Sequence, residues 1–582
     1  MILQALKEFY DRKYSEGKVP PIGFEIKEIP FLIVIDRLGN FISLEDTREP
    51  HGKRLVGKSF QVPSANVRTG SNSYMTANLL WDHIGYVLGI PKNDGPKFIE
   101  LSKNQHITWI DSLEKLPKEI RDSPEIKAIN RFYENNGIEK VLKSEQIEEC
   151  KKIPGCNIAF RLNSEPLPVP AGDVIKEYRR VHIGLPEEGE DDVFGTDLVT
   201  GETGQIVRLH HKTRINKDAD SLVSFQKNSG YDSYGKEQGF NSPITKMTEF
   251  AYTTALNYLL KSEKHRIQVG NSHTVFWGSK NNNLEEKFSG LFEDPEAIDP
   301  DTDISLVREL FNSVKSGAYI NDDGEIPFYV LGLSPNSARI SIRFWENGKV
   351  SEYSERIKQY FDDFSIISEQ NNPEFYPLQK ILANISKLDK FENIPPRLAG
   401  NVMRAILEGT TYPATMLQLA IQRIRSDTKC RVTRIRAATI KAYLNRYYRL
   451  YQNKKIKEIT MKLDETQPAA AYQLGRLFAA LERIQEKANP KLNTTIRERY
   501  YGSACTSPVT VFPTLLRLKN HHLAKIEKKG IVIWFEKKLG EIMGNIEVFP
   551  SHLNLHDQGM FAIGYYHQRQ DFFTKKEETA ED

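Results

Sequence analysis

The Pro395-Pro396 pair separates two parts of the chain that differ in their pattern of apolar residues. Before this pair, segments with the alternating pattern of strands mix with segments of helical periodicity, whereas beyond it strand patterns nearly vanish. At 582 residues the chain also exceeds what one hydrophobic core usually supports, so we expect roughly two to four domains. The sequence therefore predicts an α+β fold, with mixed α/β N-terminal and central regions followed by an all-α C-terminal region that ends in a helical bundle.

Turn residues and apolar spacing place the main elements along the chain. In the α+β part we expect hairpins at 31–44 and 328–345 and a strand at 274–277. Helices are expected at 2–10, 75–88 and 245–260, with a loop rich in Gly, Ser, Asn and basic residues at 52–73. A helix that follows Gln467-Pro468, and helices at about 511–528, 535–544 and 557–570, would form the C-terminal bundle.

These elements divide the chain into four predicted domains. An N-terminal α+β domain covers residues 1–240, and a central α+β region covers 241–395. A basic helical segment follows at 396–460, and the C-terminal helical bundle covers 461–582.

Composition excludes several classes of protein. Apolar residues make up 39% and charged residues 27%, which favours a globular fold over disorder. The longest apolar run, 29–35, is too short to span a bilayer and the N-terminus lacks a signal-peptide pattern, so a cytoplasmic protein without membrane association is predicted. Cys150, Cys156, Cys430 and Cys505 lack the spacing of a zinc site, so we expect reduced core thiols, no metal and no other cofactor.

The segment 397–457 is strongly basic within a chain whose net charge is only +3. It holds 14 Lys and Arg against Glu408 and Asp427, a local charge of 14 − 2 = +12, so the remaining residues sum to −9. Its basic residues are interleaved with tyrosines, a mixture that suits phosphate neutralisation together with base stacking. Candidate nucleic-acid contacts here are Arg423, Arg425, Arg434, Lys441 and Arg446, with Arg476 in the helix that follows. The alternative is a helix face balanced by acidic side chains from elsewhere in the fold.

Residues 52–59 match the phosphate-binding loop pattern Gly-x-x-x-x-Gly-Lys-Ser, so a nucleic-acid-stimulated ATPase that uses this loop is the alternative function. Such a loop needs a buried strand before it and a helix after it, so that backbone N–H groups point at the phosphates. Residues 46–51 lack a buried-strand pattern, and 60–63 cannot begin a helix. No nucleophile with a base, and no paired carboxylates, stand out elsewhere. A protein without catalytic residues is therefore favoured.

A second set of candidate nucleic-acid contacts lies near the N-terminus. Basic residues in a stretch of small polar residues can contact phosphates, while Asn and Ser can form hydrogen bonds with base edges in a duplex groove. The candidates are Lys53, Arg54, Lys58, Arg68, Asn72, Ser73, Tyr74 and Asn78, and the glycine-punctuated run 230–239 adds Lys236 and Gln238.

Eight short stretches together resemble one protein family. They are MILQAL at 1–6, ANLLWD at 77–82, SYGKEQG at 233–239, FAYTTALN at 250–257, RFW at 343–345, NIPP at 393–396, LGRLFA at 474–479 and GYYHQRQ at 564–570. In this order they resemble the large subunit of the type I-C CRISPR interference complex (Cascade), a Csd-type CRISPR-associated protein.

This resemblance implies a subunit without catalysis of its own that works with CRISPR RNA, with backbone and handle-binding subunits and with a small subunit. Its expected roles are to recognise the protospacer-adjacent motif (PAM) in double-stranded target DNA, to help R-loop formation, to hold the displaced non-target strand, and to recruit a separate helicase-nuclease in trans. Protein reads the PAM and base pairing reads the rest in other RNA-guided effectors. The N-terminal domain would then sense the PAM, and the basic segment would hold a strand.

The resemblance also implies that the small subunit corresponds to the C-terminal part of the large one and is made from an internal translation start. Met461 lies just before the predicted bundle, and 582 − 461 + 1 leaves 122 residues. Lys457-Glu458 can be encoded by a ribosome-binding sequence, with the codons of Ile459 and Thr460 before the start. We therefore expect a free C-terminal product that begins at Met461.

Overall fold

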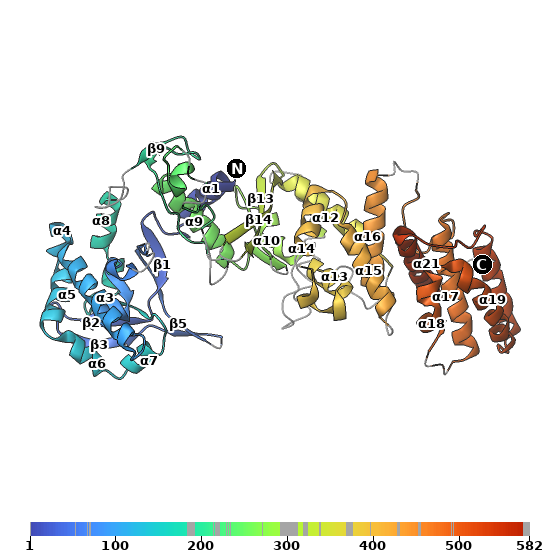
Figure 1. Cartoon of the computed structure of the whole chain (residues 1–582), viewed down its shortest axis with the longest axis horizontal. Helices are drawn as coiled ribbons and strands as arrows, with labels where there is room; N and C mark the ends of the chain where they lie inside the picture. Colours follow the sequence, from blue (N-terminus) through green and yellow to red (C-terminus); the bar gives the residue numbers. More distant parts are fainter. Residues whose placement is uncertain are drawn as a thin grey trace. The chain divides into compact units, whose positions relative to one another are not determined.

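The structure of the protein, a computed structural model, describes most of the chain (Figure 1). The described residues are 2–52, 54–66, 68, 72–182, 193–213, 215, 221–227, 230, 232, 234–269, 272–291, 312–317, 324–336, 339–367, 376–395, 397–427, 431–451, 456–490, 492 and 494–573. They form two compact units: unit 1 is Met1–Thr213 with Asp220–Tyr258, and unit 2 is Arg214–Ala219 with Leu259–Asp582. The four predicted domains divide the chain more finely and stay predictions.

Unit 1 is built on a mixed four-stranded sheet with the strand order β3-β2-β8-β7. Its strands are β3 (Phe41–Asp46), β2 (Phe31–Ile35), β8 (Asn157–Leu162) and β7 (Trp81–His83). β2 pairs with β8 in parallel and with β3 in antiparallel orientation. β2 is buried along its whole length, and its continuous apolar sequence suits a strand that is covered on both faces.

Helices cover one face of this sheet, and a two-stranded ribbon covers the other. The helices are α2 (Ile84–Val87), α3 (Pro96–Glu114), α4 (Lys118–Arg121), α5 (Pro124–Glu134), α6 (Gly137–Leu142) and α7 (Ile147–Lys151). Trp109 of α3 and Phe132 of α5 share a buried cluster with Ile33 of β2. On the other face, β1 (Phe24–Glu28) pairs with β6 (Ser59–Pro63), and Phe60 packs in a smaller cluster with Leu32.

The further elements before residue 262 are short, apart from two helices that confirm predictions. They are α1 (Ile2–Ser15), β4 (Glu49–His51), β5 (Arg54–Val56), η1 (Ser73–Met75), η2 (Val169–Ala171), α8 (Asp173–His182), β9 (Phe194–Thr196), β10 (Thr203–Gln205), η3 (Gln238–Asn241) and α9 (Lys246–Lys261). α1 and α9 correspond to the helices expected at 2–10 and 245–260. Cys150, Cys156 and Cys505 are buried free thiols, and Cys430 lies outside the described residues.

The predicted helix at 75–88 is wrong, because the structure has η1, β7 and the short α2 there. Leu80 has a φ of 64°, a left-handed conformation that interrupts a right-handed helix. The Asp82 carboxylate accepts hydrogen bonds from the backbone N–H groups of Asn78 and His83, both at 2.9 Å, which gives these amides partners outside a helix. The predicted loop at 52–73 likewise contains β5 and β6.

Unit 2 begins with an antiparallel meander of four strands, paired in the order β11-β12-β13-β14. The strands are β11 (Arg266–Val269), β12 (Ser272–Gly278), β13 (Pro327–Asn336) and β14 (Arg339–Lys349), and α10 (Asn283–Lys287) and η4 (Ser289–Leu291) follow β12. The hairpins predicted at 31–44 and 328–345 and the strand at 274–277 are thus confirmed. Tyr329 and Trp345 stack with their ring centroids 5.6 Å apart on adjacent strands.

From α12 onward the described chain is helical, which confirms the all-α C-terminal region and with it the α+β fold class. The helices are α12 (Val350–Phe364), α13 (Leu378–Ile385), η5 (Lys387–Asp389), η6 (Phe391–Asn393), α14 (Leu398–Glu408), α15 (Ala414–Ser426), α16 (Arg434–Tyr451), α17 (Ala470–Ala488), α18 (Ile496–Ala504), α19 (Pro508–Ala524), α20 (Lys529–Met543) and α21 (Leu555–Phe573). One hydrophobic core joins them, from Phe276 on β12 to Tyr566 on α21.

α17 and α21 lie side by side at very short range (Figure 1). A Cβ added at Gly475 would lie 2.0 Å from the Phe561 carbonyl oxygen, and one added at Gly564 would lie 2.0 Å from that of Tyr472. One glycine on each helix therefore allows the two backbones to touch. Glu482 on α17, fully buried, accepts hydrogen bonds from side chains of α21, which adds a polar tie to this contact.

Asp363, near the C-terminal end of α12, is buried among basic side chains of α16. Asp363 and Arg446 are each 1% exposed, and Arg446 Nη2 lies 2.7 Å from Asp363 Oδ2. Arg449 Nη1 donates to Asp363 Oδ1 at 3.2 Å, and Lys441 Nζ donates to the Asp363 carbonyl at 3.0 Å. Burial raises the pKa of the Asp363 carboxyl and lowers the pKa of the Lys441 ammonium. The charged forms of these side chains therefore stabilise one another inside the fold.

Asp363→Asn is expected to destabilise the protein by about 3–5 kcal/mol, because Arg446 would keep a buried charge without an anion. The midpoint of urea unfolding, followed by circular dichroism, measures this change. The control is Glu325→Gln, which removes the partner of the exposed Lys349 and should cost less than about 1 kcal/mol. Equal shifts for the two variants would contradict a structural role for the Asp363 network.

Candidate nucleic-acid interface

One buried carboxylate, that of Asp82, holds the loop in front of β7. Asp82 is 1% exposed and forms an ion pair with Arg68, whose Nη1 donates to Asp82 Oδ1 at 3.1 Å. The Arg68 Nε donates to the Thr76 carbonyl at 2.7 Å, and the guanidinium lies 4.3 Å from the centroid of the Tyr86 ring. Arg68 thus connects the loop backbone to the sheet and to α2.

Asn78 is held by the same hydrogen bonds, and we call Asp82, Arg68 and Asn78 together the frame of this loop. Asn78 is 4% exposed, its backbone N–H donates to Asp82, and its side-chain oxygen accepts from the backbone N–H of Asn66 at 2.9 Å. Tyr86 Oη donates to the Ser73 carbonyl at 3.1 Å. Burial raises the pKa of Tyr86, so its hydroxyl stays protonated as a donor. The backbone between Ser73 and Asn78 is therefore tied down at several points.

The frame presents η1 and its N-cap residue, Asn72, to solvent. Asn72 is exposed, Ser73 and Tyr74 are half-buried, and Met75 is 61% exposed. Arg68 and Asn78, in contrast, use their polar groups inside the protein. The structure thus separates the predicted N-terminal contacts into positioning residues, Arg68 and Asn78, and presented residues.

The hairpin of β4 and β5 lacks the geometry of a phosphate-binding loop. The Lys58 backbone N–H donates to Thr47 Oγ1 at 3.2 Å and the Lys58 carbonyl accepts from the Ile29 N–H at 3.1 Å, so these groups do not face a ligand. A Cβ added at Gly57 would lie 2.9 Å from the Pro30 backbone, so close packing explains this glycine. β6 follows instead of a helix. The ATPase alternative therefore has no support in the geometry.

Two predicted basic contacts, Arg54 and Lys58, lie on or beside this hairpin. Lys58 is exposed, with its Nζ 5.8 Å from the centroid of the Phe60 ring. Arg54 begins β5, and Lys53 lies outside the described residues. Lys58 is therefore the member of this group with a described, solvent-facing side chain.

Lys236 lies in a strained turn that leads into η3, and Gln238 is the first residue of η3. Lys236 is exposed, while the Gln238 side-chain oxygen accepts a hydrogen bond from Arg208 Nη1 at 2.6 Å. Tyr234, 98% exposed, and Gln238 have φ values of 51° and 46°. Non-glycine residues adopt such angles at a cost, and this kind of strain clusters at functional sites. The turn thus presents Tyr234 and Lys236 together.

The structure places much of the basic segment inside the fold. Lys441 is 4% exposed and Arg446 1% exposed, and both bind groups of Asp363. Arg476 is 1% exposed, and its Nε donates to Gln568 Oε1 at 3.0 Å. These charged groups bind other groups of the same chain and do not reach the surface. The alternative of acidic neighbours from elsewhere in the fold therefore describes this part of the segment better than strand binding.

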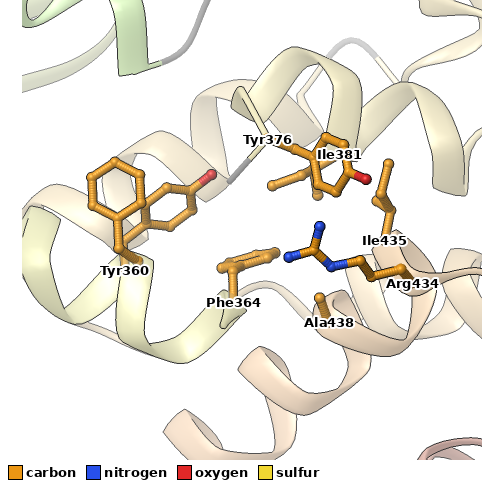
Figure 2. A pocket seen from close by; sticks show the side chains of 8 residues that line it. Tyr360, Phe364, Tyr376, Ile381, Arg434, Ile435 and Ala438 are labelled. Atoms are coloured by element: carbon orange, nitrogen blue, oxygen red, sulfur yellow. The ribbon is translucent and has the colours of Figure 1, made fainter. Parts of the chain in front are cut away.

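Arg423, Arg425 and Arg434 differ in their surroundings. Arg423 Nη2 donates to Asp389 Oδ2 at 3.0 Å, and Arg425 is exposed. Arg434 is half-buried and lines a small pocket among α12, α13 and α16, with its guanidinium 5.3 Å from the centroid of the Tyr376 ring. Figure 2 shows this guanidinium pointing into the space between Tyr376 and Phe364. Arg425 and Arg434 remain candidates for strand contact.

Most tyrosines of the segment also serve the core. Tyr443 is 5% exposed and Tyr448 is 7% exposed, and Tyr447 packs edge-on against His556 at 4.7 Å between ring centroids. Their faces are therefore not available to bases. His556 has the same structural role, and among the described residues no group of three or more His, Cys, Asp or Glu could hold a metal ion. No helix in the described ranges is long and apolar enough to cross a membrane.

Comparison with known proteins gives the class of the chain. The sequence matches the family of the CRISPR-associated protein (Cas_Csd1) over residues 6–573, so this is a CRISPR-associated protein. The chain belongs to the Csd1 family, the large subunit of the type I-C Cascade complex, which confirms the resemblance seen in the sequence. The family is generally a non-catalytic Cascade subunit, and membership implies association with Cascade and CRISPR RNA in general. No curated protein matches the sequence.

Asp82→Asn is expected to loosen the loop between Asn72 and Asn78, because the frame loses the charge that fixes Arg68. Hydrogen–deuterium exchange of the η1 amides should become about tenfold faster or more, which corresponds to about 1.4 kcal/mol of local opening free energy. Asp46→Asn is the matched control, since Asp46 pairs with Arg48 elsewhere in unit 1. Unchanged exchange at η1 in Asp82→Asn would show that Asp82 does not hold the loop.

Proposed function

We propose that this chain recognises the PAM in double-stranded target DNA through Asn72, Ser73 and Tyr74. The observation that supports this proposal is the frame of Asp82 and Arg68, which fixes the loop backbone while Asn72 stays exposed. An asparagine side chain can donate to and accept from a base edge in the major groove. A loop that is already ordered loses little entropy on binding. The arrangement therefore suits base readout better than backbone contact alone.

Basic side chains in the same unit would position the duplex. Lys58 and Lys236 are exposed, and we propose that they contact phosphates together with Lys53 and Arg54. Such contacts set register and affinity without carrying sequence information. The proposed division is thus base readout by the framed loop and phosphate contact by the flanking lysines and arginine.

The finer roles of the subunit follow from family membership. We propose that the chain, without catalysis of its own, helps R-loop formation, holds the displaced strand and recruits a separate helicase-nuclease in the cytoplasm. Its partners would be CRISPR RNA, the backbone and handle-binding subunits and the small subunit. Arg425, which is exposed, is the residue of the basic segment that we propose for strand contact, because Lys441 and Arg446 are used by Asp363. The strand contacts predicted at Arg423 and Arg434 stay predictions.

The double substitution Asn72→Ala with Ser73→Ala should reduce the preference for a PAM duplex over a PAM-less duplex by about 1–3 kcal/mol, roughly 5–150-fold. Lys58→Ala should leave this preference unchanged and reduce the slope of log affinity against log salt by about 0.9. Binding of the assembled complex to both duplexes, titrated over a range of salt, measures both quantities. Intact PAM preference in the double variant would refute the assignment of these residues.

The structure is compatible with a second product of the same gene that begins at Met461. Met461 lies between α16 and α17, its side chain is 49% exposed, and its carbonyl accepts from the Ile367 N–H at 2.9 Å. A product from this residue would contain α17 to α21 complete. We propose that this product is the small subunit.

Replacing the Met461 codon with a leucine codon is expected to abolish the 122-residue product while the full chain is still made. Mass spectrometry of the purified complex, expressed from its native operon, measures both species. The matched control is Met416→Leu, at another internal methionine, which should leave the product unchanged. A fragment that persists after the Met461 change would point to proteolysis instead of internal initiation.

A further inference from the structure

Two of the buried cysteines meet in unit 1. Cys150 lies in α7 and Cys156 lies directly before β8, and they are 0% and 1% exposed. The Cys150 thiol donates to the Cys156 sulfur, with the two Sγ atoms 3.3 Å apart. The sulfur atoms of a disulfide are about 2.05 Å apart, so this pair would have to approach by only about 1.3 Å. Cys505, in contrast, donates its thiol proton to the Gly502 carbonyl at 3.2 Å.

A tight turn brings the two thiols together. The Cys150 carbonyl accepts a hydrogen bond from the Ile153 N–H at 3.2 Å, and the Ile153 carbonyl accepts one from the Cys156 N–H at 3.1 Å. Gly155 has a φ of 66°, a left-handed conformation that costs a glycine little, and it reverses the chain just before β8. Lys152 and Gly155 are exposed. The local backbone therefore builds the contact, and opening of this one turn would bring both thiols to solvent.

The closed turn keeps the pair unreactive. The hydrogen bond to Cys156 and burial raise the pKa of the Cys150 thiol, whereas the charge of Arg48 acts in the opposite direction. The thiolate is the nucleophile in thiol–disulfide exchange, so the closed pair resists oxidants. When the turn opens, Cys150 loses both the hydrogen bond and the burial, and it regains the reactivity of an ordinary cysteine. Oxidation would therefore wait for local opening of α7, a helix of five residues.

The pair lies at the base of the strand that supports β7. The Cys156 carbonyl accepts a hydrogen bond from the Ile84 N–H at 3.0 Å, and the next residue, Asn157, pairs with His83 of β7. β7 also carries Asp82 of the loop frame. A covalent bond between Cys156 and α7 would therefore hold the start of β8, to which β7 is paired.

We propose that Cys150 and Cys156 form a reversible disulfide with a small-molecule disulfide such as oxidised glutathione as the oxidant, and that this bond stabilises the β7–β8 edge of the sheet. The Cys150 thiolate attacks one sulfur of the oxidant, which gives a mixed disulfide and releases one glutathione thiolate. The Cys156 thiolate then attacks the Cys150 sulfur and releases the second. The protein thiols lose two electrons and two protons, and the oxidant takes them up as two molecules of glutathione.

The stabilising effect follows from the position of the bond. A cross-link restricts the opened forms of the chain more than the closed one, so the segment from α7 to β8 would open less often. Disulfides that form in a reducing compartment are mostly transient and respond to the redox state. The inference goes beyond the proposed function, because it concerns the redox state of unit 1 and does not depend on which DNA the chain binds.

The test starts from the assembled complex with its thiols reduced, incubated in its native state with oxidised glutathione. Remaining thiols are then alkylated, and the chain is digested with trypsin for mass spectrometry. Trypsin cleaves after Lys151 and Lys152, so the disulfide would join the peptides 144–151 and 153–161. These joined peptides should appear with the oxidant and separate on treatment with dithiothreitol. Cys505 should be alkylated throughout and serves as an internal control.

Hydrogen–deuterium exchange then compares the oxidised and reduced complexes. The amides of β7 and of Ile84 should exchange on the order of tenfold more slowly in the oxidised form. Exchange that is unchanged or faster would overturn the stabilising role. A native complex that gives no joined peptides, or that keeps glutathione on Cys150, would overturn the disulfide itself.

Two variants separate the roles of the cysteines. Cys156→Ala removes the second nucleophile, so oxidation should stop at a glutathione adduct on Cys150. Cys505→Ala is the matched control, since it also removes a buried thiol, and it should give the joined peptides as the parent does. Joined peptides that disappear in Cys505→Ala would contradict a disulfide formed by Cys150 and Cys156 alone.

Discussion

A positive charge that leaves water needs an anion inside the fold, and unit 2 depends on this constraint. Asp363 on α12 serves Arg446 and Arg449 of α16, and Asp389 and Asp427 serve Arg436. Asp363 and Asp389 lie far in sequence from their basic partners, whereas Asp427 lies nine residues before Arg436. Each pair nevertheless joins residues of separate elements. Apolar packing alone would allow these helices to pack in several registers. A buried ion pair forms in only one of these registers, because the two charged groups must meet. We therefore regard the charge network as the feature that fixes the arrangement of α12, η5 and the C-terminal end of α15 around α16.

Much of the fold could be predicted from local pattern. The apolar run of β2, the hairpin of β13 and β14, and the periodicity of α9 each reflect contacts that neighbouring residues make in one element. The helix expected at 75–88 failed for a different reason: Leu80 adopts a left-handed φ and Asp82 accepts backbone hydrogen bonds. Apolar spacing carries no information about either feature, because both depend on how β7 joins the sheet.

The types of residue in the candidate site could be predicted from the sequence, but which of their side chains are exposed to solvent could not. A window of high charge drew attention to Arg446 and Lys441, whose partner Asp363 lies outside the window, and proximity in space cannot be read from charge counts. In the N-terminal loop, residue type drew attention to residues 68–78, and only the hydrogen bonds of Asp82 distinguish the buried partner Arg68 from the exposed Asn72.

The hydrophobic core of unit 2 contains residues from both sides of Met461 in the sequence. A Cβ added at Gly559 on α21 would lie 2.9 Å from Ile440 of α16, and Tyr566 Oη donates to the Ile367 carbonyl at 2.8 Å. A product that begins at Met461 would lack this cover and would expose apolar surface of α21. The folded state of this product would then be stabilised by binding to a surface that covers α21. When the concentration of that binding partner is a hundred times the dissociation constant, the free energy of unfolding rises by about 2.7 kcal/mol. Unassembled copies would be the preferred substrates of cellular proteases, so the amount of this product would follow the number of complexes that can bind it.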